Sequence, residues 1–304
     1  MTPYISIVIP VYNSENGLDE LFAGIDAAMG SSPYEVIFID DGSKDNSWKK
    51  LVELKNKHPQ KIVSIKFARN FGQHNAILCG FGFCKGELIV TMDDDLQHPP
   101  EEIAKLVAKY EETRADVVYG VYNNKQHGIV QNAGSYFVKK TSKYFENKMG
   151  EGSSFRLIKK EIAQKIKENH QHNFLFIDEV IQWYTGNITF ANVNHNARKY
   201  GKSSYSFFKL TNLYFNILVN YSALPLKLMT YSGLLFSIIT FFMGMRFIYK
   251  KLVHNVPLGY TSTIVSILFT ASIILLCLGI IGQYIYKLYQ FQHHKPPYSI
   301  QTVI

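Results

Sequence analysis

The chain has 304 residues, a formal net charge of +8 and 47% hydrophobic residues. Its Lys and Arg residues are scattered and form no basic run with interleaved aromatic residues, which argues against nucleic-acid binding and favours anionic lipids and phosphorylated substrates as partners. Three cysteines without a C-x-x-C spacing argue against a disulfide framework or a zinc site, and they fit reduced thiols in the cytosol.

Apolar runs alternate with helical spacings over the first 120 residues. Short runs rich in Ile, Val, Leu and Phe predict buried strands at Ile5–Val11, Glu35–Asp40, Val63–Phe67, Leu88–Met92 and Val117–Gly120. Apolar residues at helical spacing predict helices at Leu18–Met29, Asp45–Lys57, Gln73–Phe83 and Glu101–Glu112. Two later runs predict strands at Ser154–Ile158 and Ile188–Val193. This alternation predicts an α/β fold with a doubly wound, mostly parallel sheet.

Two long uncharged segments follow the α/β part. Leu228 to Met245 carries no charge over 18 residues, and Leu258 to Tyr286 carries none over 29. A bilayer core of about 30 Å needs roughly 20 apolar residues in a helix, so both segments predict transmembrane helices. The short link Lys250–Pro257 makes them a hairpin, and two buried core helices are the alternative. The aromatic-rich segment Tyr205–Leu224 predicts an interfacial helix at the headgroups or an ordinary core helix.

Acidic clusters follow two of the predicted strands. Asp40 to Ser43 (DDGS) ends the second strand, and Asp93 to Gln97 (DDDLQ) ends the fourth. Ligands of open α/β sheets bind at the carboxyl ends of the strands, so both clusters should face one crevice. Clustered carboxylates repel each other unless a cation compensates, and Mg²⁺ or Mn²⁺ often bridges carboxylates to substrate phosphates. We interpret the clusters as a site for a divalent metal that holds a diphosphate; a turn and a helix start are the alternative interpretations.

Longer motifs around these clusters carry a family resemblance. They are IVIPVYNSEN at Ile7–Asn16, FIDDGSKD at Phe38–Asp45, ARNFGQHNAILCGF at Ala68–Phe81, GELIVTMDDDLQHPPE at Gly86–Glu101, SSFRLI at Ser153–Ile158 and RKYGKSSY at Arg198–Tyr205. With these blocks in order and two terminal spans, the chain resembles family 2 glycosyltransferases of the GT-A (Rossmann-like) fold. The closer resemblance is to their polyprenyl-phosphate branch, which includes dolichol-phosphate mannose synthases and bactoprenol (undecaprenyl-phosphate) glycosyltransferases.

The resemblance implies where the donor nucleotide and its metal bind. Residues that match the family's nucleotide site are Pro10, Tyr12, Glu15, Asp41 and Asp93. Asp95 and Gln97 match the ligands of Mg²⁺ or Mn²⁺, and Asp93 and Asp95 together form the D-x-D pair. With Arg198, the D-x-D pair makes up the expected catalytic residues.

The resemblance also implies a set of phosphate-binding cations. Arg198 and Lys202 match basic residues of the R-x-x-G-x-S block that approach the phosphates. Arg69 and Arg156 match arginines of the R-N-F-G and F-R-L blocks. For these two we expect either phosphate binding or structural ion pairing with the acidic clusters.

Three features depart from the family pattern. The family often has Glu directly after the Y-N pair, where this chain has Ser14, and an Asp before F-R-L, where it has Ser154. An arginine pair is common after the fifth strand, but Gly120–Gln131 offers only a lysine and a histidine. Asp178 and Glu179 could be the acid pair that supplies a base in other family 2 enzymes, although the block around them matches poorly.

The expected function is an inverting, metal-dependent transfer of a sugar from a nucleotide-sugar to a polyprenyl phosphate, which is undecaprenyl phosphate in a bacterium. A UDP-sugar is favoured and GDP-mannose is open. The product would be a lipid-linked sugar donor for cell-envelope glycan or lipopolysaccharide modification. A membrane-bound polysaccharide synthase of the same fold and a non-catalytic membrane scaffold are the alternatives.

The expected layout places catalysis on the cytoplasmic side of the cell (inner) membrane. The first ten residues lack the features of a signal peptide. We expect a cytoplasmic GT-A domain at 1–203, an interfacial juxtamembrane helix at 204–225, and a transmembrane hairpin at 226–304. The hairpin spans are about 226–249 and 260–286, with a short cytoplasmic tail. Both termini are expected in the cytoplasm, and the chain is open to forming a homo-oligomer.

Overall fold

The computed structural model describes residues 3–121, 154–169, 176–196, 259–292 and 296–304, together with scattered positions between 229 and 253. The chain divides into two compact units, Met1–Ser203 with Pro296–Ile304 and Ser204–Lys295. The first unit is an α/β domain, here called the sheet domain. The second contains the long helix α10, Tyr260–Gln292.

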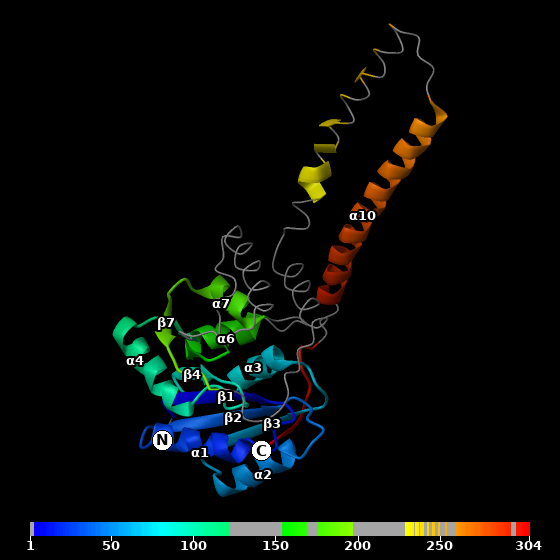
Figure 1. The fold of residues 1–304 in the computed structure, drawn as a ribbon. Helices are drawn as coiled ribbons and strands as arrows, with labels where there is room; N and C mark the ends of the chain where they lie inside the picture. The colour runs from blue at the N-terminus through cyan, green and yellow to red at the C-terminus, as the bar shows by residue number, and fades with distance from the viewer. Residues whose placement is uncertain are drawn as a thin grey trace. The chain divides into compact units, whose positions relative to one another are not determined.

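One eight-stranded sheet is the frame of the sheet domain (Figure 1). Its strands are β1 Ile5–Val11, β2 Tyr34–Asp40, β3 Ile62–Phe67, β4 Leu88–Thr91, β5 Val117–Val121, β6 Arg156–Lys159, β7 Ile188–Asn192 and β8 Ile300–Val303. They lie in the order β7-β5-β6-β4-β1-β2-β3-β8. β1 pairs in parallel with β2 and β4, β2 with β3, and β5 with β7, whereas β6 and β8 run antiparallel to their neighbours. The sheet is therefore mostly parallel, as the sequence predicts.

Helices cover both faces of the sheet. Their bounds are α1 Leu18–Met29, α2 Ser47–Lys57, α3 Gln73–Phe81, α4 Ile103–Thr113, α6 Lys160–Asn169 and α7 Ile177–Tyr184. α1, α2 and α4 lie on one face, and α3 lies on the other, where it contacts β1 and β2 (Figure 1). α6 packs beside α3, and α7 packs against α6. This is the three-layer arrangement expected of a doubly wound sheet.

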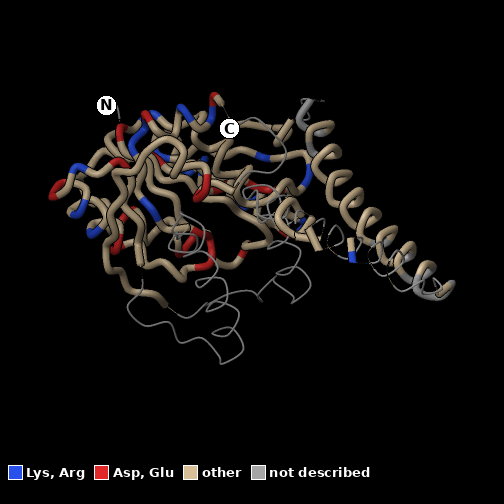
Figure 2. Tube along the Cα trace, turned by 90° about the horizontal axis from the view of Figure 1, so that it is seen from above, with Lys and Arg blue, Asp and Glu red and all other residues tan. Residues whose placement is uncertain are grey.

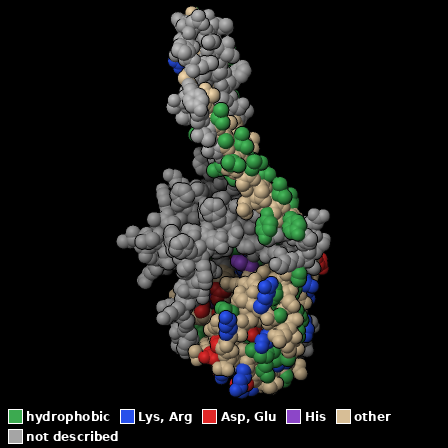
Figure 3. Space-filling model, turned by 90° about the vertical axis from the view of Figure 1, so that its right-hand side faces the viewer, with side chains coloured by type: hydrophobic (Ala, Val, Ile, Leu, Met, Phe, Trp, Pro, Cys, Tyr) green, Lys and Arg blue, Asp and Glu red, His purple; other side chains and the backbone are tan. Residues whose placement is uncertain are grey.

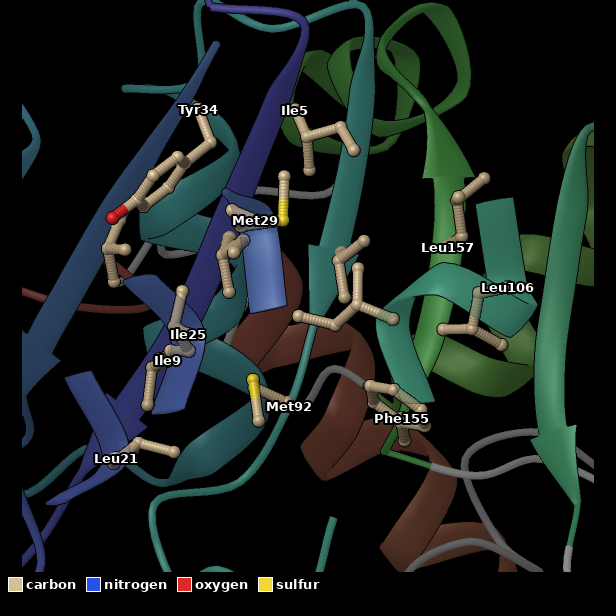
Figure 4. Close-up of a cluster of buried hydrophobic side chains, with 14 of the residues drawn as sticks. Ile5, Ile9, Leu21, Ile25, Met29, Tyr34, Met92, Leu106, Phe155 and Leu157 are labelled. Atoms are coloured by element: carbon tan, nitrogen blue, oxygen red, sulfur yellow. The ribbon is translucent and has the colours of Figure 1, made fainter. Parts of the chain in front are cut away.

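Alternate residues of β1 supply both layers of the core. Ile5 and Ile9 are buried on the face that carries α1, where Ile9 lies beside Leu21 and Ile25 (Figure 4). Side chains of a strand alternate between faces, so Val8 points to the opposite layer. There α3 approaches so closely that a Cβ atom added at Gly80 would lie 2.4 Å from Val8 Cγ1. Burial on both faces explains why this strand reads as an unbroken apolar run.

The predicted elements agree with the observed ones except at some ends. All seven predicted strands are present, with bounds that differ by at most two residues. The helix expected from Asp45 begins at Ser47, because the Asp45 carboxylate accepts the Ser47 N–H (3.0 Å) and hydroxyl (2.6 Å) hydrogen bonds. The helix expected from Glu101 opens with a 3₁₀ turn, η1 Pro100–Glu102, and α4 follows it.

The last residues of the chain complete the sheet, which the sequence analysis did not anticipate. The expected short tail contains a strand, β8, which pairs with β3, and hydrogen bonds join Ser64 and Ile304 in both directions (3.0 and 2.9 Å). The ring of Tyr298 stacks on Phe67, with centroids 5.3 Å apart. Residues 296–304 thus belong to the sheet domain and not to the hairpin, so the chain leaves this domain near Ser203 and returns to it at Pro296.

α10 has the length and composition of a membrane-spanning helix. Its 33 residues extend about 50 Å, and Lys287 is its only charged residue. The stretch Phe269–Tyr286 has a mean hydropathy of 1.8 and is not buried. The tube of this helix is tan over most of its length, and its surface is lined with apolar side chains (Figures 2 and 3). Among the described residues it is the one helix that meets these criteria.

The other expected elements of this unit are covered only in part. Of the first span, 226–249, the described positions include the helical stretch Met229–Gly233. The expected interfacial helix at 204–225 lies outside the described residues.

Candidate active site

β1, β2 and β4 are neighbours in the sheet, and the order of the strands reverses at β1. β4 lies on one side of β1 and β2 on the other, so the carboxyl end of β1 is a topological switch point. Open α/β sheets bind their ligands at such points. The two acidic clusters follow β2 and β4. The loop after β1 bonds to both, since Asn13 N–H donates to Ser43 Oγ (3.0 Å) and Tyr12 N–H to Asp94 Oδ2 (3.1 Å).

Asp41 fastens the loop after β3 to the end of β2. Its carboxylate accepts hydrogen bonds from the N–H groups of Phe71 (2.6 Å) and Gly72 (2.8 Å). Burial raises the pKa of Asp41 to about 6, while these two donors act in the opposite direction by favouring the charged form. The backbone of Arg69 comes so near that a Cβ atom at Gly42 would lie 2.5 Å from the Arg69 carbonyl carbon. Gly42 also has a φ of +69°, which glycine adopts without strain.

Arg69 lies exposed at the edge of this loop. Its guanidinium carbon is 4.8 Å from the centroid of the Phe71 ring, a cation–π arrangement. Within the described parts of the chain, Arg69 forms no ion pair with either acidic cluster. Its charge is therefore available to a bound anion.

The D-D-D segment brings potential metal ligands together. One ligand atom from each of Asp93, Asp95 and His98 lies within 4.8 Å of the others. Gln73 and Ser154 donate hydrogen bonds to Asp93, and Gln97 N–H donates to Asp95 Oδ1 at 3.2 Å. Two carboxylates and an imidazole form a donor set that fits a divalent cation.

His98 is a functional candidate that the sequence analysis missed. It is buried, and its ring stacks on Phe155 with centroids 5.2 Å apart. Burial lowers the pKa of His98, which favours the neutral imidazole that a metal needs. The available signal was a ligand-type residue three positions after Asp95. The Asp95–Gln97 pair remains the ligand set that the family resemblance implies.

The loop after β1 carries the remaining expected nucleotide contacts. Tyr12 is 41% exposed, whereas Pro10 is buried within β1. Glu15 braces the loop after β2, because its carboxylate accepts the Asn46 N–H hydrogen bond at 2.9 Å. Asn13 has a φ of +55°, a conformation that non-glycine residues rarely adopt outside turns. This loop therefore presents an exposed aromatic ring on a backbone that is held at several points.

Arg156 lies beneath the site and not at its surface. Its side chain is 1% exposed; it donates from Nη1 to Asp178 and from Nε to Thr91 Oγ1 (3.0 Å). The guanidinium also lies over the ring of Tyr119, 5.9 Å from its centroid. Its charge is thus balanced by Asp178, at the start of α7, and not by the acidic clusters. The carboxylate of Asp178, considered above as part of an acid pair, is already engaged.

The segment after β7 contacts the residues that follow the D-D-D segment. Asn196 N–H donates to the carbonyl oxygen of Gln97 at 3.0 Å. The rings of His195 and His98 are 6.1 Å apart, edge to face. Arg198 and Lys202, the expected phosphate-binding residues, lie outside the described residues.

Comparison with known proteins identifies relatives of the whole chain. Residues 6–183 match the profile of the family described as Glycosyl transferase family 2. The undecaprenyl-phosphate 4-deoxy-4-formamido-L-arabinose transferase of Klebsiella pneumoniae subsp. pneumoniae is 32% identical over 309 residues, which cover 99% of this chain and 93% of that protein. The same enzyme from a second Klebsiella pneumoniae strain matches to the same extent.

A solved structure supports the fold. Glucosyl-3-phosphoglycerate synthase of Mycobacterium tuberculosis, in complex with Mn²⁺ and UDP-glucose, aligns with a TM-score of 0.51 and 15% identity. The alignment covers 72% of this chain and 78% of that one.

The buried pair gives a stability prediction. Asp178→Asn keeps the shape of the side chain but leaves the Arg156 guanidinium without a balancing charge. We expect the free energy of unfolding to fall by about 3 kcal/mol, the lower end for buried pairs because Asp178 is 16% exposed. Thermal unfolding of the detergent-solubilised protein measures the change.

Glu161→Gln is the matched control. It makes the same chemical change in the Lys165–Glu161 pair, which is exposed on α6 and should contribute less than about 1 kcal/mol. The double variant Arg156→Met/Asp178→Leu should recover most of the lost stability, because it removes both charges. Equal unfolding temperatures for Asp178→Asn and Glu161→Gln would contradict a structural role for the pair.

Proposed function

The chain belongs to family 2 of the glycosyltransferases, and from that premise we propose that it transfers a sugar from a nucleotide-sugar to a polyprenyl phosphate. Undecaprenyl phosphate is the acceptor if the source is bacterial. The observation that carries the proposal is the meeting of three strand-end loops at the switch point, with Asp93, Asp95 and His98 converging on one place. The length of the match to a transferase named for undecaprenyl phosphate supports the acceptor class.

The donor would lie across the three loops. Tyr12 and the Asp41 loop offer the nucleoside an exposed ring and a fixed backbone, and the D-D-D segment lies beside them. Asp95 would hold a Mg²⁺ or Mn²⁺ ion with Asp93, His98 or Gln97. When bound, such an ion neutralises the diphosphate and stabilises the charge that develops on the leaving group. UDP is the favoured nucleotide, with GDP open.

The chemistry asks little of a protein base. An oxygen of the acceptor phosphate is already anionic at neutral pH and attacks the anomeric carbon directly, so no strong general base is needed. The bond from that carbon to the diphosphate oxygen breaks, and the nucleoside diphosphate leaves with the electron pair. In-line attack inverts the anomeric centre. The ion pair with Arg156 already occupies the Asp178 carboxylate, and a reaction that needs no protein base is consistent with that pairing.

Chain connectivity supports a membrane hairpin. The sheet domain includes both Met1–Ser203 and Pro296–Ile304, so the chain between them starts and ends on the same side of any membrane. If α10 crosses a bilayer once, the chain must cross an even number of times. The uncharged segment from Leu228 to Met245 is the second crossing that this requires. We place the sheet domain and both termini in the cytoplasm, in a multi-pass protein of the cell (inner) membrane.

A donor screen tests the function. Purified protein is incubated with undecaprenyl phosphate and a panel of UDP-sugars and GDP-mannose, and the lipid product is identified by mass. Asp95→Asn should lower transfer by about 100-fold or more, because the metal loses an anionic ligand. Chelator should inhibit the wild type, and excess Mn²⁺ should restore it. Asp19→Asn, an exposed carboxylate on α1, is the matched control. Full transfer by Asp95→Asn in chelator would refute the metal assignment.

Arg198 gives a test of acceptor recognition. Arg198 can grip phosphate oxygens with two parallel hydrogen bonds. Arg198→Ala should lose about 2–4 kcal/mol of transition-state stabilisation, or about 30- to 1000-fold in rate. Arg198→Lys should recover only part, since a point charge lacks the paired contact. Rates are measured in detergent, away from bulk anionic lipid; near wild-type turnover of Arg198→Ala there would make it a headgroup anchor.

The hairpin gives a topology prediction. A cysteine introduced as Asn255→Cys, in the link between the two uncharged segments, should react with a membrane-impermeant thiol reagent added to intact cells. Asn56→Cys, on α2 of the sheet domain, should react only after the membrane is broken. The opposite pattern would contradict the proposed orientation, and protection of both cysteines in intact cells would rule out the hairpin.

A further inference from the structure

The middle carboxylate of the D-D-D segment has partners unlike those of its neighbours. Asp93 accepts hydrogen bonds from Gln73 and Ser154 and, like Asp95, lies in the potential metal cluster. Asp94 instead accepts two hydrogen bonds from the loop after β1. The donors to its Oδ2 atom are Tyr12 N–H at 3.1 Å and Ser14 Oγ at 2.5 Å.

The loop that Asp94 holds is anchored on its other side by the loop after β2. Asn13 N–H donates to Ser43 Oγ at 3.0 Å, and Ser14 N–H donates to Ser47 Oγ at 2.8 Å. Asn13 keeps a positive φ within this frame. The exposed Tyr12 ring therefore stands on a short backbone segment that is fixed between the two acidic clusters.

Ser14 is also where the chain departs from the family pattern, which often has glutamate at this position. In this chain the glutamate stands one position later, at Glu15, where it accepts the Asn46 N–H, and the Ser14 hydroxyl donates to a carboxylate on the loop after β4. A hydrogen bond to a carboxylate is roughly twice as strong as one between neutral groups. The Ser14 hydroxyl therefore forms a strong hydrogen bond between the loop after β1 and the loop after β4.

We propose that Asp94 is a positioning residue that, through Ser14 and the Tyr12 backbone, fastens the nucleoside-binding loop to the metal-binding loop. This inference rests on the proposed function of the site. With the two loops joined, nucleoside and diphosphate meet a surface that is already ordered, so binding does not require the loop to lose further freedom. Loss of the contact should weaken donor binding, while transfer from bound donor continues.

The experiment compares four single variants in the full-length, detergent-solubilised protein. Asp94→Ala removes both acceptor contacts, and Asp94→Asn keeps an acceptor oxygen without the charge. Ser14→Ala removes the hydroxyl, and Ser14→Thr keeps it. Isothermal titration measures the Kd of UDP, or of GDP if wild type prefers it, once with Mn²⁺ and once with EDTA. Transfer assays give KM for the donor and kcat.

Asp94→Ala should raise Kd and donor KM about 10-fold or more, and Ser14→Ala somewhat less. Asp94→Asn should fall between wild type and Asp94→Ala, and Ser14→Thr should bind like wild type. The kcat at saturating donor should stay within about threefold of wild type for Ser14→Ala. The double variant Ser14→Ala/Asp94→Ala should bind UDP no more weakly than Asp94→Ala alone, because the Ser14 change removes a hydrogen bond that the Asp94 change has already removed.

The comparison with and without metal separates this role from metal binding. Equal loss of UDP affinity in Mn²⁺ and in EDTA supports the positioning role. Loss confined to Mn²⁺ would make Asp94 a metal ligand and overturn the inference, as would wild-type affinity for both Asp94→Ala and Ser14→Ala. If wild type itself binds neither UDP nor GDP, the proposed function fails, and the inference fails with it.

Discussion

Carboxyl groups lie close enough to repel one another within each of the two acidic clusters, at the ends of β2 and β4, and burial makes their charged forms more costly still. The pKa of Asp40 is raised, and those of Asp41 and Asp94 rise to about 6, in each case chiefly through burial. Backbone N–H groups and hydroxyls of neighbouring loops donate hydrogen bonds to these carboxylates and so stabilise them. The same hydrogen bonds, with the one from Asn13 to Ser43, join the loops after β1, β2, β3 and β4. The geometry of the site follows from where its negative charge is compensated.

Much of the sheet domain could be predicted because its strands are buried on both faces. Ile5–Val11 is apolar at every position but Ser6 and Pro10, so its bounds were visible in the sequence. β8 was not, because its four residues are exposed, two of them are polar, and they follow a long apolar segment. Only the free edge of β3, with Phe67 beside Tyr298, gives those residues a partner, and that edge exists only in the folded protein.

In the site, the motifs gave the positions of the residues but not the directions of their side chains. The motifs placed Asp41, Asp93 and Asp95 at the right strand ends. They could not tell that the side chain of Arg156 points into the protein toward Asp178, since both directions are open to a residue next to a strand end. Nor could they tell that Asp93 and Asp95 lie in the possible metal site whereas Asp94 bonds to the loop after β1. Those choices depend on partners 20 to 80 positions away in the chain.

The pairing of β8 with β3 also sets an order on biosynthesis. Strands β1 to β7 leave the ribosome first, but β3 keeps one open edge until residues 300–303 have been made. An unpaired edge strand is a template for association with other chains. The last strand to be translated follows α10, so the sheet can close only after the entire apolar segment has left the ribosome. A nascent chain arrested before that point would lack β8, and Phe67 would lack the stacked ring of Tyr298.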